Sequence, residues 1–258
     1  MKKTLTLLIL FLLSLQLSLP VKGQYTFTRY TPASGLLAYQ TNTVVQDKEG
    51  FIWIGSTNGL QRFDGKEYKS FQMANSQLPS NPVWQLLVDN KNNLWVLLAS
   101  GKVGIFDTKK FIFHEVETHF RKEISPVTYV KRLITDQSGH LFYLIGGSEV
   151  ITYSPQANEF SYRYNFMPFK AKWGIVDFVQ QPHTHKYWIS LSNGGLAVYN
   201  LKTRRWNESG HNPDHEILID QLNPKEVYNR LFFDSKKRFW YISPVISPPI
   251  GCYDIARR

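Results

Sequence analysis

The sequence predicts an all-β fold, and three observations support this prediction. Aromatic residues make up 15% of the 258 residues, a share typical of sheet-rich proteins. A segment that combines a turn with a short apolar strand recurs along the chain about every 45 residues. Helical periodicity is nowhere sustained, which excludes a helical solenoid, and a hydrophobic content of 43% excludes a disordered chain.

Residues 1–23 are expected to be a secretory signal peptide that takes no part in the fold. Lys2 and Lys3 precede an apolar run from Leu5 to Leu19, which ends in a break before Gly23. An uncleaved membrane anchor is the alternative, although the run is short for a bilayer span. Removing three lysines with this segment leaves 27 positive against 20 negative side chains, a net charge of +7. We therefore expect residues 24–258 to be exported, soluble and periplasmic.

Five copies of one pattern organise residues 24–258. In the first copy, the turn Asp47–Gly50 leads into the apolar stretch Phe51–Ile54, which contains Trp53. Aromatic residues recur at its equivalent position with intervals of 42, 47, 46 and 52 residues: Trp95, Phe142, Trp188 and Trp240. An aspartate stands six residues before this aromatic in four copies, at Asp47, Asp89, Asp136 and Asp234, and Pro182 replaces it in the fourth copy.

Each copy predicts four antiparallel strands. In the first turn, Asp47 can bond its own backbone and Gly50 can supply a positive φ. The apolar strand after it shows no alternation, as expected when both faces are covered. Further turns at Thr57–Gly59 and Asp64–Gly65 precede two more strands. About 40–45 residues per four-stranded unit is the spacing of a β-propeller blade. The predicted fold is therefore a β-propeller of about five four-stranded antiparallel blades.

The first two copies resemble the two-component-regulator propeller repeat. The resemblance rests on Val44–Ser56 and Gly59–Gly65, and on Leu78–Asn81 before the second copy; it is looser in copies three to five. It implies the extracytoplasmic sensor region of a hybrid two-component histidine kinase. In such proteins, propellers precede an immunoglobulin-like domain, a membrane helix and the kinase.

Ile250–Asp254 are expected to form the third strand of the fifth blade. A propeller closes its ring to hide its edges, typically with about 4–8 blades. We therefore expect residues 24–258 to be a partial domain, truncated in the fifth blade of a larger, seven-bladed ring. The chain would then be the N-terminal fragment of a kinase.

Positions that are equivalent between copies but differ in chemistry are candidates for ligand binding. The residue three before the turn aspartate is expected to be core in every copy: Val44, Leu86, Leu133, Val179 and Leu231. Five before it stand Asn42, Trp84, Lys131, Asp177 and Asn229, and four before it stand Thr43, Gln85, Arg132, Phe178 and Arg230. Both sets should lie where the inner strand enters the central channel. The predicted ligand-binding residues are Asn42, Trp84, Lys131, Arg132, Asp177 and Arg230; the competing interpretation is solvated strand ends.

The sequence predicts a ligand sensor with no catalytic constellation in this segment. Aromatic, amide and charged groups in a concave site suit a small molecule or an oligosaccharide of polar, glycan-like character. The other expected partners are the membrane and kinase domains of the same parent chain, and a homodimer of the full-length protein is compatible with this reading. No cofactor is expected, and no nucleic acid, which an exported chain rarely meets. The alternatives are a secreted propeller enzyme, a lyase or glycoside hydrolase, and a cell-surface scaffold that binds another protein.

The remaining reactive residues are expected to have structural roles. His183 with His185, and His211 with His215, offer metal-type spacing but lack further converging ligands, so we expect turn histidines. The repeated aspartates lie in successive blades, too far apart for acid–base pairing, and are expected to stabilise turns. Cys252 is the single cysteine, which excludes a disulfide framework, and we expect it to be buried.

Overall fold

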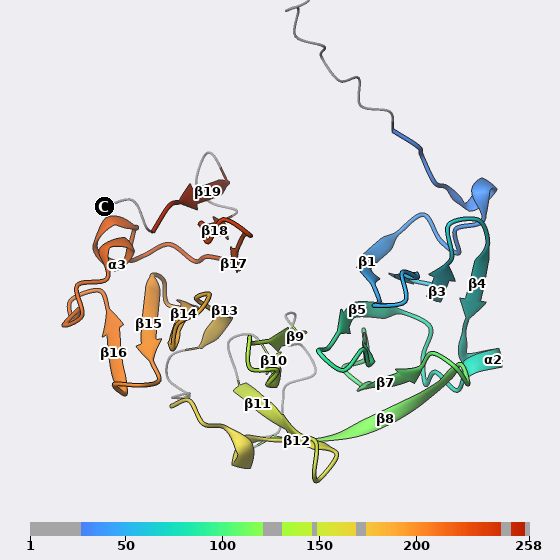
Figure 1. Ribbon diagram of the computed structural model, residues 1–258, viewed down its shortest axis with the longest axis horizontal. Helices are drawn as coiled ribbons and strands as arrows, with labels where there is room; N and C mark the ends of the chain where they lie inside the picture. Colours follow the sequence, from blue (N-terminus) through green and yellow to red (C-terminus); the bar gives the residue numbers. More distant parts are fainter. Residues whose placement is uncertain (1–26, 121–130, 146–148, 169–173, 244–248, 256–258) are drawn as a thin grey trace, which may run out of the picture.

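A computed structural model describes residues 27–120, 131–145, 149–168, 174–243 and 249–255. Their strands form five blades that lie in an arc around a common centre (Figure 1). Blades one to four have four strands each, and three strands are described for blade five. This arrangement confirms the predicted β-propeller. The expected signal peptide lies outside the described residues.

The blades follow one another along the chain. Blade one comprises β1 (Thr41–Gln46), β2 (Ile52–Ser56), β3 (Gly59–Phe63) and β4 (Tyr68–Phe71). Blade two comprises β5 (Val83–Val88), β6 (Leu94–Leu98), β7 (Val103–Asp107) and β8 (Ile112–His119). Blade three comprises β9 (Lys131–Thr135), β10 (Leu141–Ile145), β11 (Glu149–Ser154) and β12 (Glu159–Ser161). Blade four comprises β13 (Ile175–Gln180), β14 (Lys186–Leu191), β15 (Leu196–Asn200) and β16 (Arg205–Glu208), and blade five β17 (Arg230–Phe233), β18 (Phe239–Ile242) and β19 (Ile250–Tyr253). The helical segments described are η1 (Pro32–Ser34), α2 (Met73–Ser76), η2 (Tyr162–Tyr164) and α3 (Ile217–Gln221).

Within each blade the strands pair antiparallel in chain order, so each blade is a meander. The first strands β1, β5, β9, β13 and β17 face the common centre (Figure 1). One pairing was not predicted: the outer strands β8 and β12 pair in parallel, with Glu159 opposite Glu117, and join blades two and three into one eight-stranded sheet. The eight-residue β8 is long enough to pair both with β7 and with β12.

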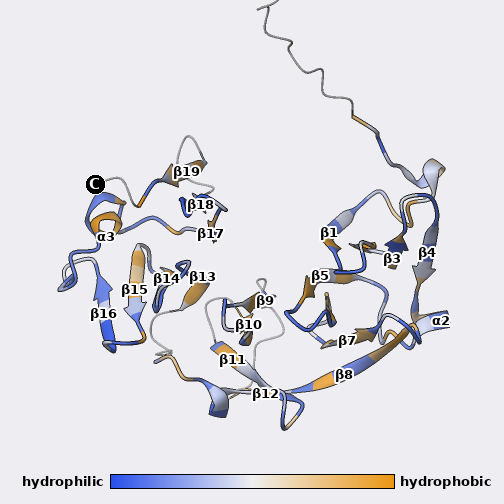
Figure 2. Cartoon of the chain, in the orientation of Figure 1, coloured by the Kyte–Doolittle hydropathy of each residue, from blue (hydrophilic) through white to orange (hydrophobic). Residues whose placement is uncertain are grey.

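The hydrophobic core lies in layers between successive blades. Between blades one and two, for example, Trp53 and Phe71 pack with Leu86 and Val96. Similar clusters fill the spaces between the later blades. The second strand of a blade that lies between two others is therefore covered on both faces, and all five residues of β6 are buried. Figure 2 shows hydrophobic residues on the inner strands β5 and β13, whereas the peripheral strand β16 is hydrophilic.

The two ends of the arc correct two predictions. Leu86, Leu133 and Leu231 are buried as expected because each packs against the preceding blade. Val44 is 60% exposed, since no described blade precedes β1. Cys252 was expected to be buried and is exposed: it lies opposite Trp240 on the face of blade five that no described blade covers. On blades two to five the burial of the inner strand thus depends on the neighbouring blade.

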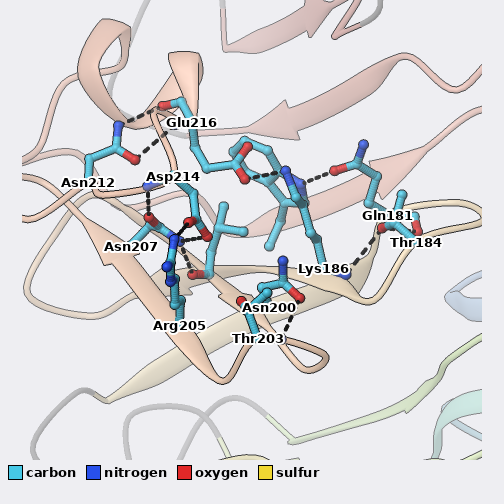
Figure 3. A network of polar contacts seen from close by, with 12 residues as sticks. Gln181, Thr184, Lys186, Asn200, Thr203, Arg205, Asn207, Asn212, Asp214 and Glu216 are labelled. Carbon is cyan, nitrogen blue, oxygen red and sulfur yellow. Dashed lines mark hydrogen bonds and ion pairs between the residues drawn. The ribbon is translucent and has the colours of Figure 1, made fainter.

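A polar network holds the segment before α3 against blade four (Figure 3). The Asn207 side chain accepts a hydrogen bond from the Asp214 backbone N–H at 2.9 Å and donates one to the Asp214 carboxylate at 3.2 Å. Arg205 pairs with the same carboxylate at 2.9 Å. Hydrogen bonds from Arg205 and Asn207 hold the pKa of Asp214 below its ordinary value. Lys186 pairs with Glu216, which directly precedes α3.

Candidate functional site

Four of the six predicted ligand-binding residues line one cavity at the centre of the arc. Asn42 and Trp84 come from β1 and β5, Arg132 from β9 and Arg230 from β17. Thr43 and Gln85 complete the lining of this cavity, which has a volume of about 250 Å³. We call it the central cavity. The other two predicted residues, Lys131 and Asp177, do not line it.

β-Bulges explain why Asn42 and Trp84 turn toward the central cavity. The pairing of β1 with β2 shifts register between Thr41 and Thr43, and that of β5 with β6 shifts between Val83 and Gln85. Asn42 and Trp84 are therefore the extra residues of two bulges, a feature that redirects a side chain. Asn42 donates to the Val83 carbonyl at 2.8 Å, and Trp84 is 45% exposed.

Lys131 lies elsewhere because β9 has no such bulge. It pairs regularly with Ile145 at the start of the strand. Its Nζ lies 3.3 Å from the Ser100 carbonyl oxygen, at a second cavity of about 500 Å³ that Tyr143 and His119 also line. The chemistry of Lys131 was visible in the sequence, but the direction of its side chain depends on the strand pairing.

The register of blade four corrects the internal alignment by one residue. Val179 pairs with Trp188, as Leu87 pairs with Trp95. The turn after β13 closes from Gln181 to Lys186, one residue longer than the turn from Asp47 to Phe51 in blade one. Phe178, which is 2% exposed, thus takes the core position expected for Val179. Asp177 is consequently equivalent to Thr43, Gln85, Arg132 and Arg230, and Val176 takes the place that Asp177 was given.

The corrected position ties blades one, two and four to the blade that follows each of them. The Leu86 backbone N–H donates to Thr43 Oγ1 at 3.2 Å. Gln85 accepts from the Leu133 backbone N–H at 2.8 Å and donates to the Leu133 carbonyl at 2.9 Å. The Leu231 backbone N–H donates to Asp177 Oδ2 at 2.8 Å. These side chains have a structural role, and the carboxylate of Asp177, 1% exposed, is committed to it.

Blade three departs from this rule because Arg132 has no acceptor. The backbone N–H of Phe178, which an acceptor at Arg132 would have served, bonds to Asp177 Oδ1 at 2.9 Å instead. Arg132 Nη1 lies 2.6 Å from Asp177 Oδ2. Burial raises the pKa of Asp177 and outweighs the opposing effect of Arg132. Among the described residues, the buried Arg132 Nε has no hydrogen-bond partner.

Arg230 brings a second positive charge to the central cavity. Burial and the neighbouring guanidinium of Arg132 lower the pKa of Arg230, against a smaller opposing effect of Asp177. Arg230 occupies the tie position of blade five, the last blade described. The cavity therefore combines two cations, amides and an exposed indole, a set of groups that can bind a polar ligand.

The turn aspartates have the structural role that the sequence predicts, and a further one. Asp47 Oδ1 accepts from the backbone N–H groups of Glu49 and Phe51 at 3.0 and 2.9 Å. Asp47 Oδ2 also accepts from the indole N–H of Trp53 at 2.7 Å. The same aspartate–tryptophan bond joins Asp89 to Trp95 and Asp234 to Trp240, each at 3.0 Å. The constant six-residue spacing was the signal for this bond, and Gln181 replaces the aspartate in blade four, bonding Trp188 at 3.0 Å.

Blade three again departs from the pattern, since Phe142 has no indole. Asp136 Oδ2 accepts instead from the Tyr187 hydroxyl at 2.8 Å, across the boundary to blade four. Burial and this bond raise the pKa of Tyr187 far above its usual range. The same oxygen contacts His140 Nδ1 at 2.7 Å. Asp136 thus links two blades where its counterparts act within one.

The histidines predicted to lie in turns do so. His183 and His215 have positive φ values of 58° and 55°, and neither pair of histidines belongs to a metal-type group within the described ranges. One such group was missed: Glu117, His119 and Glu159 bring ligand-type atoms within 4.8 Å of one another at the junction of β8 and β12. The signal was absent from the sequence because the parallel pairing of these strands was not predicted.

Comparison with known proteins identifies the repeat. Residues 77–98 match the sequence profile of the family described as two component regulator propeller. The chain carries a two component regulator propeller repeat. A segment of 59 residues is 34% identical to histidine kinase P4 of Formosa agariphila. This segment makes up 22% of the present chain and 4% of that kinase.

Solved structures support the propeller fold. The extracellular domain of the hybrid two component system BT3049 from B. thetaiotaomicron superposes with a TM-score of 0.63 at 15% identity, covering 90% of this chain and 31% of that one. Virginiamycin B lyase from Staphylococcus aureus superposes with a TM-score of 0.53 at 11% identity, covering 83% and 70%. The chain thus spans a small part of the length of the kinase and about a third of the extracellular domain of BT3049. In the described part of the chain, none of the helices has the length and apolar character that a membrane span requires.

Proposed function

We propose that the chain is the extracytoplasmic ligand-binding sensor propeller of a two-component system, at the N-terminal end of a hybrid histidine kinase. The central cavity carries this proposal, because it gathers Asn42, Trp84, Arg132 and Arg230 from four inner strands into one concave site. The regulator-propeller repeat and the matching segment of a histidine kinase support the signalling role. The signal-peptide pattern of residues 1–23 supports export to the periplasm.

We infer that the ligand is polar and of saccharide type. An exposed tryptophan can stack on the apolar face of a sugar ring, and amide and guanidinium groups can bond its hydroxyls. A volume of about 250 Å³ lies just below the range of roughly 300–1,000 Å³ for drug-sized ligands, so a small ligand or the end unit of a longer one fits.

Signalling would follow from the way in which the cavity is built. Its lining comes from blades one, two, three and five, and the same inner strands carry the ties between blades. A ligand that binds one arrangement of blades better than another shifts the population toward it. Apolar groups are exposed on the face of blade five that no described blade covers, including Phe232, which is 43% exposed. They support the proposal of further blades after blade five. The membrane and kinase parts, and a dimer of the full-length protein, would receive this change.

The cavity favours binding over catalysis. An acid–base mechanism needs carboxylate or imidazole groups that can exchange protons with the substrate. The carboxylate that pairs with a lining residue, that of Asp177, is buried and engaged by Arg132, Leu231 and Phe178. This commitment supports a binding role, and the lyase similarity concerns the fold.

The test is calorimetric titration of the purified chain with a panel of plant and bacterial oligosaccharides. We expect saturable binding that Trp84→Ala weakens at least tenfold, with no change in the oligosaccharide recovered afterwards. Tyr39→Ala is the matched control, because Tyr39 is an exposed aromatic, 84% accessible, outside the central cavity. Binding that Trp84→Ala leaves intact would place the site elsewhere. Conversion of the oligosaccharide would favour the propeller enzyme.

A further inference from the structure

The central cavity has an excess of positive charge. Its ionisable lining residues, within the described ranges, are Arg132 and Arg230. Asp177 neutralises the charge of Arg132 through an ion pair of 2.6 Å. Asp177 itself is buried and does not line the cavity. Two cations against one carboxylate leave a net positive charge in a partly enclosed site, where electrostatic attraction is stronger than in open water.

The donors of Arg132 are not used up by the described residues. A guanidinium has five N–H donors. Arg132 Nη1 lies at ion-pair distance from Asp177, but neither Nη1 nor the buried Nε makes a hydrogen bond of normal geometry with the described residues. A buried donor without an acceptor costs free energy, which a ligand oxygen would recover. The guanidinium of Arg132 lies close enough to help lower the pKa of Arg230, after the larger effect of burial. A negatively charged group between them would be attracted by both.

The identity of the tie residue in blade three supports a ligand role for Arg132. Threonine, glutamine and aspartate at the equivalent positions of blades one, two and four all accept a hydrogen bond from the next blade. Arginine cannot do this, so blade three forgoes that tie. The loss places a charged donor on the cavity surface, with its side chain 17% exposed.

We propose that the central cavity binds an oxyanion-bearing ligand, an acidic saccharide whose carboxylate or sulfate group is held by Arg132 and Arg230 while its ring lies against Trp84. Planar guanidinium groups suit this recognition because their parallel N–H donors match the two oxygens of a carboxylate. This inference rests on the proposed sensor function and defines the class of its ligand.

The experiment compares three probes in calorimetric titration of the purified chain. The first is digalacturonate, the second is its dimethyl ester, which has the same rings without charge, and the third is inorganic sulfate. We expect digalacturonate to bind at least about tenfold more tightly than the ester, as one or two charge-assisted hydrogen bonds allow. Sulfate should compete with digalacturonate but bind more weakly alone, because it lacks the ring that contacts Trp84.

Variants separate charge recognition from ring recognition. Arg230→Gln should remove the preference for digalacturonate and leave the affinity for the dimethyl ester unchanged. Arg163→Gln is the matched control: Arg163 is an exposed arginine of η2, outside the central cavity, and its loss changes the net charge equally. Arg132→Lys keeps a cation beside Asp177, so the variant should fold. Its affinity for digalacturonate should fall, whereas its affinity for the ester should not. Trp84→Ala should weaken the binding of digalacturonate and of its ester to the same extent.

The outcomes distinguish a failure of the anionic ligand class from a failure of the proposed sensor cavity. Acid and ester binding equally, with Trp84→Ala weakening both and Arg230→Gln neither, would leave the sensor cavity standing and overturn the anion inference. Selectivity for the acid that Arg163→Gln reduces as much as Arg230→Gln would show an effect of net charge and overturn it as well. Binding of none of the three probes would overturn the acidic ligand class, and the oligosaccharide panel would then test the sensor function separately.

Discussion

The aspartate–tryptophan bond makes a quantitative prediction for Asp47→Ala. The substitution removes the acceptor of three hydrogen bonds, from the backbone N–H groups of Glu49 and Phe51 and from the indole of Trp53. Water can replace the carboxylate at exposed Glu49, whereas Phe51 N–H is half-buried and Trp53 is fully buried. A shielded donor left without a partner costs about 1–3 kcal/mol, so the two predict a loss of about 2–6 kcal/mol in the free energy of unfolding.

Two further variants test the origin of this loss. Asp47→Asn retains an oxygen for the backbone donors but presents an amide N–H₂ to the indole, so its loss should be smaller and due to Trp53. Asp64→Ala is the matched control: Asp64 Oδ1 accepts from the backbone N–H groups of Lys66 and Glu67 at 2.8 and 2.7 Å on an exposed turn without an indole.

Equilibrium urea denaturation, followed by tryptophan fluorescence and circular dichroism, measures these differences. We expect Asp47→Ala to be the least stable variant, Asp47→Asn to be intermediate, and Asp64→Ala to stay close to the parent chain because water replaces the lost acceptor. Equal losses for Asp47→Ala and Asp64→Ala would refute the reasoning, since the turn alone would then account for the effect.

Three further predictions concern other parts of the fold. Burial acts to raise the pKa of Asp234, but hydrogen bonds from Trp240 and Arg238 outweigh it and lower the pKa well below its ordinary value. Its stabilisation is therefore complete above about pH 4 and is lost as the pH falls further, so Asp234→Asn should differ from the parent more at pH 7 than at pH 3 in denaturation experiments. Arg132→Met leaves Asp177 buried without its ion-pair partner and should cost about 3–5 kcal/mol in the free energy of unfolding; a second change, Asp177→Asn, should partly restore it, and a loss that Asp177→Asn leaves uncorrected would contradict the ion-pair explanation. Cys252 is exposed and should react fully with a thiol reagent without denaturant, whereas a protected thiol would show that its face is covered.

The sequence by itself was sufficient to predict the blades. A turn aspartate six residues before an aromatic, followed by glycine and short apolar runs, specifies a hairpin through contacts between residues that are near in the chain. The aspartate signal recurs in four of the five blades, and this was enough to predict the strands, their antiparallel order and the propeller. In blade four this reading was shifted by one residue, because a turn one residue longer leaves no mark until the strands pair.

Only the tertiary structure decided which of the candidate side chains meet. Asn42 and Arg230 are far apart in the chain and line one cavity because the blades are arranged around a common centre. Bulges turn Asn42 and Trp84 toward that cavity, whereas regular pairing sends Lys131 to another. Val44 is exposed where its counterparts are buried, since its burial depends on a preceding blade. Hairpins are encoded by local spacing, but a site between blades depends on packing and strand register, which no local pattern records.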